Sequence, residues 1–147
     1  MMFGEEIENE IKEFINKIGN IHYHSDSNYG VEYLNNNFRF LGTKIDLSKE
    51  KNYVSYDFKK NNFLDMMTFF EFEDIKEKIL ESNEIHYVGD GITNSELVFS
   101  GKEFFKLLEF LFVNIPEHHY FFDMEKKWCL LIATEGWIDY GEKSIEI

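Results

Sequence analysis

Six consecutive apolar residues, 128–133, constrain the fold more than any other segment of the chain. Successive side chains of a β-strand point to opposite faces of its sheet, so both faces of a strand at 128–133 are apolar. Such a strand is expected inside a sheet that other elements cover on both sides. The chain has 147 residues, a size typical of one domain with one hydrophobic core, so we expect residues 1–147 to form a single globular domain.

The rest of the C-terminal half alternates between strand and helix patterns. Strands are predicted at 85–88, 96–99, 120–124 and 137–140, and turns at 124–127 and 134–136 allow an antiparallel meander. A helix is predicted at 101–114. Ser100 and Glu103 have the spacing of a capping box at its start, and Pro116 prevents its continuation.

Helical periodicity also marks three segments of the first 82 residues. Residues 7–18 carry apolar side chains three and four apart until Gly19, which predicts an amphipathic first helix. The segment 62–70 is ambiguous but favours a helix, and 71–82 has an apolar stripe with supporting charge pairs.

Residues 21–58 show strand signals separated by polar turns. Strands are expected at 31–34, at 38–47 with a break near Gly42, and at 53–58, with a turn at 35–37. A meander is the simplest arrangement of these strands. The predicted fold class is therefore α+β, a mostly antiparallel sheet with three to four helices packed on it.

The net charge of −13 restricts the partners of such a domain. The acidic excess is spread evenly along the chain, and Arg39 is the only arginine. Nucleic acid and anionic lipid surfaces repel such a protein, so we expect neither as a partner, whereas a basic protein is favoured electrostatically.

With no signal-peptide pattern, no membrane-length apolar run and Cys129 as the single cysteine, the sequence predicts a cytoplasmic protein without disulfides.

Candidates for chemistry are few. His22 and His24 are two residues apart on a predicted strand, so both rings can point to one side, as paired zinc ligands do, with Asp26, His118 or His119 as a third ligand only if the fold brings it close. The alternative is ordinary surface histidines. We therefore predict no cofactor, and Cys129 is expected to be a buried packing residue.

A carboxylate pair also flanks Trp137. Glu135 and Asp139 could suggest glycoside hydrolysis, but an acidic chain supplies such pairs by chance, and hydrolysis also requires a cleft and separated protonation states. Because no motif assembles a nucleophile, a base and an oxyanion site, the sequence predicts a protein that is not an enzyme.

The C-terminal segment resembles a known family. An aromatic strand at 118–123, a turn, a tryptophan-containing strand at 127–130 and an acidic, aromatic strand ending at Gly141 look like the terminal strands of small bacterial immunity proteins. These proteins accompany polymorphic or contact-dependent growth inhibition toxins. The resemblance covers about the last 30 residues; it implies a compact cytoplasmic protein that binds and blocks a cognate toxin, and it carries over no binding residue.

Acidity and the resemblance together favour a domain that blocks a basic toxin sterically and electrostatically. The acidic residues expected at such an interface lie in the first helix and near the C-terminus; they are Glu5, Glu6, Glu10, Glu13, Glu135, Asp139 and Glu142. Two other classes stay open. One is a small-ligand-binding or enzymatic α+β domain, which a pocket of converging polar groups would favour, and the other is a stress or sporulation accessory protein.

Overall fold

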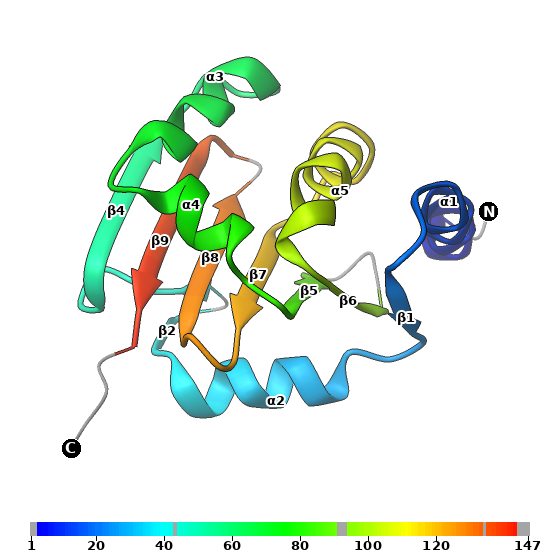
Figure 1. Ribbon diagram of the computed structural model, residues 1–147, viewed down its shortest axis with the longest axis horizontal. Coiled ribbons are helices and arrows are strands. Elements are labelled where there is room, and N and C mark those ends of the chain that lie inside the picture. The colour runs from blue at the N-terminus through cyan, green and yellow to red at the C-terminus, as the bar shows by residue number, and fades with distance from the viewer. Residues whose placement is uncertain (1–2, 43, 91–93, 134, 144–147) are drawn as a thin grey trace.

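The protein forms a three-layer α+β structure around a seven-stranded antiparallel sheet (Figure 1). The computed structural model describes residues 3–42, 44–90, 94–133 and 135–143. The strand order is β1-β6-β5-β7-β8-β9-β4. The strands are β1 His22–His24, β4 Lys51–Asp57, β5 Ile85–Gly89, β6 Glu96–Phe99, β7 His119–Asp123, β8 Trp128–Ala133 and β9 Trp137–Glu142.

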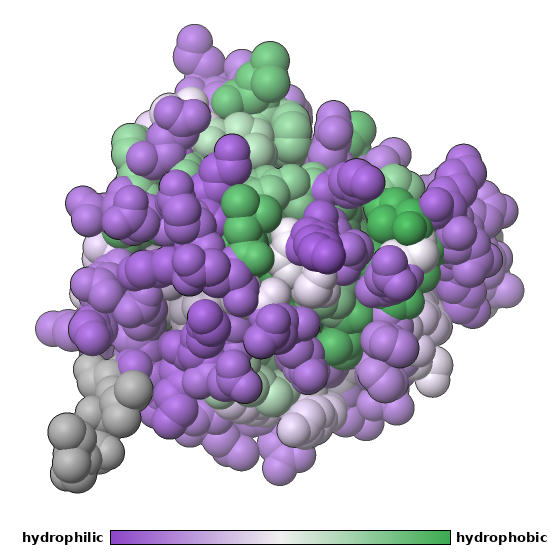
Figure 2. All heavy atoms as spheres, viewed as in Figure 1, coloured by the Kyte–Doolittle hydropathy of each residue, from purple (hydrophilic) through white to green (hydrophobic). Residues whose placement is uncertain are grey.

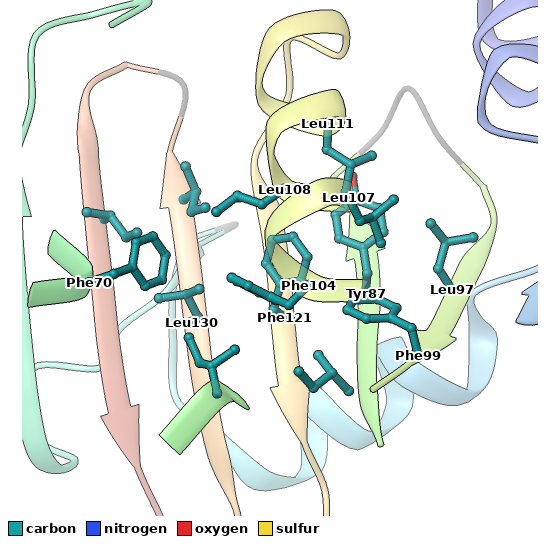
Figure 3. Close-up of a cluster of buried hydrophobic side chains, with 14 of the residues drawn as sticks. Phe70, Tyr87, Leu97, Phe99, Phe104, Leu107, Leu108, Leu111, Phe121 and Leu130 are labelled. Atoms are coloured by element: carbon teal, nitrogen blue, oxygen red, sulfur yellow. The ribbon is translucent and has the colours of Figure 1, made fainter. Parts of the chain in front are cut away.

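One face of the sheet carries the larger helical layer. Its elements are α1 Phe3–Ile18, α3 Phe63–Met67, the 3-10 helix η1 Thr68–Glu71, α4 Ile75–Leu80 and α5 Gly101–Asn114. In the main core, Phe104, Leu107 and Leu108 of α5 lie over Phe121 and Leu130 of the sheet (Figure 3). Helix α5 therefore packs near the middle of the sheet.

The opposite face is covered by α2 Asn28–Asn37 and by the hairpin of β2 Phe40–Leu41 and β3 Lys44–Ile45. Here Leu34 of α2 packs with Phe122, Cys129 and Leu131. The prediction that both faces of the strand at 128–133 are covered is thus confirmed. Cys129 is buried, as expected, and burial raises the pKa of its thiol far above the usual range.

The strongest local signals of the sequence are confirmed. Helix α5 begins at Gly101 behind Ser100, whose hydroxyl and the Glu103 carboxylate form the predicted capping box. Helix α1 ends at Ile18, and Gly19 follows it with φ +76°, a conformation that glycine adopts readily. Strands β7, β8 and β9 form the predicted antiparallel meander. Gly91 and Thr134, in the turn candidates that follow β5 and β8, lie outside the described residues.

The prediction for residues 21–58 was wrong in two respects. The expected strand at 31–34 and turn at 35–37 are part of helix α2. The expected meander does not form, because β1 pairs with β6 at one edge of the sheet and β4 pairs with β9 at the other. Only short strands, β2 and β3, occupy 38–47, on either side of the predicted break near Gly42.

The helix predicted at 71–82 is shorter than expected. Residues 68–71 form η1, and α4 begins only at Ile75, after Glu73 and Asp74 with φ values of 50° and 59°. Leu80, an apolar residue near the end of this segment, is 47% exposed. Within the described ranges there are five α-helices and one 3-10 helix, and α2 is the helix that the sequence did not predict.

Candidate functional site

The predicted acidic residues fall into two groups at opposite edges of the sheet. Glu5, Glu6, Glu10 and Glu13 are exposed on α1, which lies beside β1 (Figure 1). The other group lies next to β4: Glu135 precedes β9, and Asp139 and Glu142 belong to it. The structure therefore does not bring all the predicted partner-binding residues together.

The carboxylates near β9 already have partners within the protein. Glu135 binds His118 at 2.9 Å and Lys44 at 3.3 Å, and the bond from His118 is the main cause of the lowered pKa of Glu135. Asp139 accepts a hydrogen bond from the Ser55 hydroxyl, and its pKa is raised because it is partly buried. Glu135 and Asp139 thus each use one carboxylate oxygen in bonds within the protein.

Glu142 has a different role. Its Oε2 binds the Lys78 ammonium at 2.7 Å and accepts a bond from the Tyr140 hydroxyl at 2.6 Å, while Oε1 accepts one from the Asn52 amide. Burial opposes ionisation of Glu142, but these three bonds outweigh it and lower the pKa of its carboxyl. Glu142 thus stays ionised and neutralises Lys78.

An acidic groove, here called the β4 groove, lies between β4 and the segment from η1 to α4. It encloses about 790 Å³ and is lined by Asn52, Tyr53, Val54, Ser55, Glu71, Phe72, Glu73, Asp74 and Lys78. Glu71, Glu73 and Asp74 are exposed, and none of them forms an ion pair with a described residue. Lys78 is the single cation of the lining, and Glu142 holds it, so three carboxylates dominate the groove.

The edge of the sheet is open beside this groove. The backbone N–H of Phe58 donates to the Gly136 carbonyl at 2.9 Å, so Phe58 and alternate residues before it face β9. The backbone groups of Ser55 and Asp57 therefore point outward, and no strand in the described part of the chain pairs with them. Figure 2 shows hydrophilic side chains over this edge, over α4 and over α1.

A second hollow, here called the histidine cavity, lies at the opposite edge of the sheet between β1 and the start of α2. It encloses about 410 Å³ and is lined by His22, His24, Asp26, Tyr29, Glu84, His86, Glu96 and Val98. The sheet register explains why these residues meet. His22 lies opposite Val98, which lies opposite His86, while His24 lies opposite Glu96, so His22, His24, His86 and Glu96 point to one face.

A buried ion pair forms the floor of the cavity. His86 Nδ1 lies 2.6 Å from Glu96 Oε2, and His86 Nε2 lies 2.8 Å from Glu84 Oε1. Burial lowers the pKa of His86, but hydrogen bonds and charges from both carboxylates outweigh it, and the net pKa is raised. The His86 ring also stacks on Phe122, with ring centroids 5.4 Å apart.

Glu96 joins this pair to helix α2. Its Oε1 accepts a hydrogen bond of 2.8 Å from the backbone N–H of Gly30, in the first turn of α2. The carboxylate therefore satisfies one of the free amides of the helix N-terminus, where a negative charge is favourable. A side chain at position 30 would collide with it, since an added Cβ would lie 2.5 Å from Oε1.

The predicted metal ligands His22 and His24 both line this cavity, and so does Asp26. Among the residues that the structure describes, however, no group of three His, Cys, Asp or Glu side chains stands close enough to hold a metal ion. The other two possible third ligands are engaged elsewhere. His118 pairs with Asp90 and Glu135, and buried His119 contacts Tyr87 and Ile115.

The grouping of Glu84, His86 and Glu96 was not predicted from the sequence. A signal was present in the strands themselves: His86 and Glu96 are the polar residues of two otherwise apolar segments, 85–88 and 96–99. An isolated charge in a buried strand is expected to find a partner of opposite charge. The pairing of β5 with β6 supplies it, and sequence alone did not specify that register.

Within the described ranges, every helix is too short or too polar to reach across a bilayer. Neither protein-family models, curated proteins nor solved structures match this chain.

Proposed function

We propose that this protein is a non-enzymatic binding domain that blocks a basic partner protein, and that it acts as the immunity protein of a bacterial toxin system. The observation that carries the proposal is the β4 groove, where Glu71, Glu73 and Asp74 form an exposed acidic surface beside an unpaired strand edge. Cationic surfaces are steered towards such a surface over distances comparable to the Debye length.

The groove combines charge with contact area. Tyr53, Val54 and Phe72 add apolar surface to the same lining, and a typical interface has an apolar centre with a polar rim. Glu142 assists without touching the partner, because it neutralises the lysine that would otherwise weaken the acidic field. The predicted carboxylates of β9 would thus support binding rather than provide the contact surface.

The test is complex formation with the toxin domain encoded next to the gene of this protein. The complex should be tight at about 50 mM NaCl. The two proteins should associate more slowly at about 500 mM NaCl, because salt screens the electrostatic attraction between them. Simultaneous Glu71→Gln, Glu73→Gln and Asp74→Asn substitutions should slow association about tenfold at low salt.

The matched control removes three charges from α1 instead, with Glu6→Gln, Glu10→Gln and Glu13→Gln. If this control slows association more than the groove variant does, the interface lies on the surface of α1 instead. Absence of a complex at low salt would refute the proposal for the neighbouring toxin.

A second candidate function is binding of a small ligand, and the histidine cavity favours it. The cavity brings polar groups from β1, β5, β6 and the start of α2 to one hollow, as ligand sites commonly do.

A further inference from the structure

The histidine cavity offers hydrogen-bond acceptors that the protein does not use. Glu84 meets His86 through Oε1, and its Oε2 accepts no bond from any described residue. Asp26 accepts a bond from the backbone N–H of Asn28 through Oδ1, which likewise leaves Oδ2 open among the described residues. The exposed rings of His22 and His24 each add a nitrogen that accepts a hydrogen bond when the ring is neutral.

The charge of the cavity selects the sign of the ligand. Asp26, Glu84 and Glu96 contribute three negative charges, and His86 contributes at most one positive charge. The excess of negative charge repels anions and attracts a cation. The floor cannot neutralise this excess, because His86 is already shared between Glu84 and Glu96.

An aromatic ring stands at the mouth of the cavity. Tyr29 is 64% exposed, and its ring centroid lies 6.4 Å from that of His86. Helix α2 presents this ring, and the bond from the Gly30 amide to Glu96 fixes the start of the helix. An exposed tyrosine ring beside carboxylates is a favourable surface for a cation that can stack on it.

The combination of features distinguishes between cations. A metal ion lacks a ligand set here, since no group of three ligating side chains is close enough in the described residues. A guanidinium group is planar, stacks on aromatic rings and carries five N–H donors, whereas an ammonium group is a compact charge with three donors. The open carboxylate oxygens and imidazole nitrogens can accept several hydrogen bonds, which suits the five donors of a guanidinium group better than the three of an ammonium group.

We propose that the histidine cavity binds a guanidinium group, which stacks on Tyr29 and donates to Glu84 and Asp26. The group comes either from an arginine side chain of the protein partner or from a free guanidino compound. Only the first source rests on the proposed function.

The direct test uses L-argininamide as the probe, with binding followed through the ring NMR signals of His22, His24 and His86. L-lysinamide and L-norleucinamide are the comparisons, the first with an ammonium group and the second without a side-chain charge. We expect L-argininamide to shift these signals at the lowest concentration. Equal binding of all three probes, or no shift with L-argininamide, would overturn the proposal.

Two variants test the contacts. Glu84→Gln removes an exposed charge and should weaken binding of L-argininamide about fivefold, the upper range for an exposed ion pair. Tyr29→Leu should weaken it about threefold through loss of stacking. Glu109→Gln, an exposed carboxylate on α5 in the other layer, is the control and should leave binding unchanged. Unchanged binding in both Glu84→Gln and Tyr29→Leu would also overturn the proposal.

Measuring how the same variants bind the toxin domain identifies the source of the guanidinium group. If Glu84→Gln and Tyr29→Leu weaken both L-argininamide and the toxin, the ligand is an arginine of the partner. If they weaken L-argininamide but leave the toxin complex intact, the ligand is a free guanidino compound. If the cavity binds L-argininamide but the protein forms no complex with the toxin, the proposed function fails while this inference stands.

Discussion

His119 shows how the environment of one buried residue sets the pH dependence of the protein. Its Nε2 lies 3.1 Å from the Ile115 carbonyl, which can only accept, so Nε2 carries the proton and donates. Nδ1 then accepts a hydrogen bond of 2.7 Å from the Tyr87 hydroxyl. Complete burial is the main cause that lowers the pKa of His119 to about 4, so the ring is neutral in the folded protein.

We predict that His119 makes the protein less stable as the pH falls below about 6.5, the ordinary pKa of histidine. Between this value and about 4 the unfolded chain binds a proton that the folded chain excludes. At pH 5 the loss should be about 2 kcal/mol relative to pH 7. Urea unfolding at both pH values should show that His119→Gln reduces this loss. His24→Gln, at an exposed position, should leave it unchanged.

His86 has the opposite effect on stability. Its pKa is raised in the folded protein, so the stability that it contributes is fully present below its unfolded pKa and is lost as the pH rises through the folded value. The two histidines therefore favour a stability maximum near neutral pH. The sequence could not distinguish the two histidines, because their partners come from the tertiary structure as well as from neighbouring positions; these partners are Tyr87, Ile115, Glu84 and Glu96.

Helix α2 shows where local sequence signals fail for a whole element. It contains asparagine and glycine, which are poor helix formers, and its N-cap residue, Ser27, makes no capping hydrogen bond through its side chain. Its buried residues are Gly30 and Leu34. This apolar stripe is too narrow to indicate a helix, and the segment Val31 to Leu34 looks like a strand. The bond to Glu96 and the packing of Leu34 on the sheet supply the missing stabilisation. Helix α5, with its own capping box and wide apolar stripe, was predictable for the opposite reason.

We predict that Gly30→Ala destabilises the protein by about 2 kcal/mol, although alanine is ordinarily favoured over glycine inside a helix by up to about 1 kcal/mol. The added Cβ would lie 2.5 Å from Glu96 Oε1 and 3.0 Å from the Phe122 ring, so the buried ion pair must shift. Urea unfolding measures the change. Asn35→Ala, at an exposed position of the same helix, is the control and should be neutral or slightly stabilising. A stabilised Gly30→Ala would show that Glu96 can move away from α2 at little cost.

At the scale of the whole molecule, the two halves of the chain contribute different parts of the sheet. The C-terminal half provides the contiguous strands β6, β5, β7, β8 and β9, and the N-terminal strands β1 and β4 join at the two edges. The sequence predicted the local hairpins of the C-terminal half because short turns connect them. It could not place β1 and β4, whose partners are about 75 and 85 residues away along the chain. The β4 groove and the histidine cavity lie at these two edges, so neither candidate site could be predicted in full.

The acidic surface of the molecule should reduce its stability as well as attract a partner. Like charges that lack counter-charges repel one another in the compact state, and Glu71, Glu73 and Asp74 form no ion pair with a described residue. We predict that Glu71→Gln, Glu73→Gln and Asp74→Asn together raise the free energy of unfolding by about 1 kcal/mol at low salt, and that about 0.5 M NaCl removes most of this gain by screening.

Urea unfolding at low and high salt measures this effect, and Lys106→Gln is the control of opposite sign. Lys106 is an exposed cation, so its neutralisation makes the net charge more negative and should lower stability at low salt. A triple variant that is less stable than the native protein would mean that the groove carboxylates stabilise the fold and are not a free binding surface. A more stable variant that binds the toxin domain more slowly would indicate that the repulsion persists in the native protein because the same charges attract the partner.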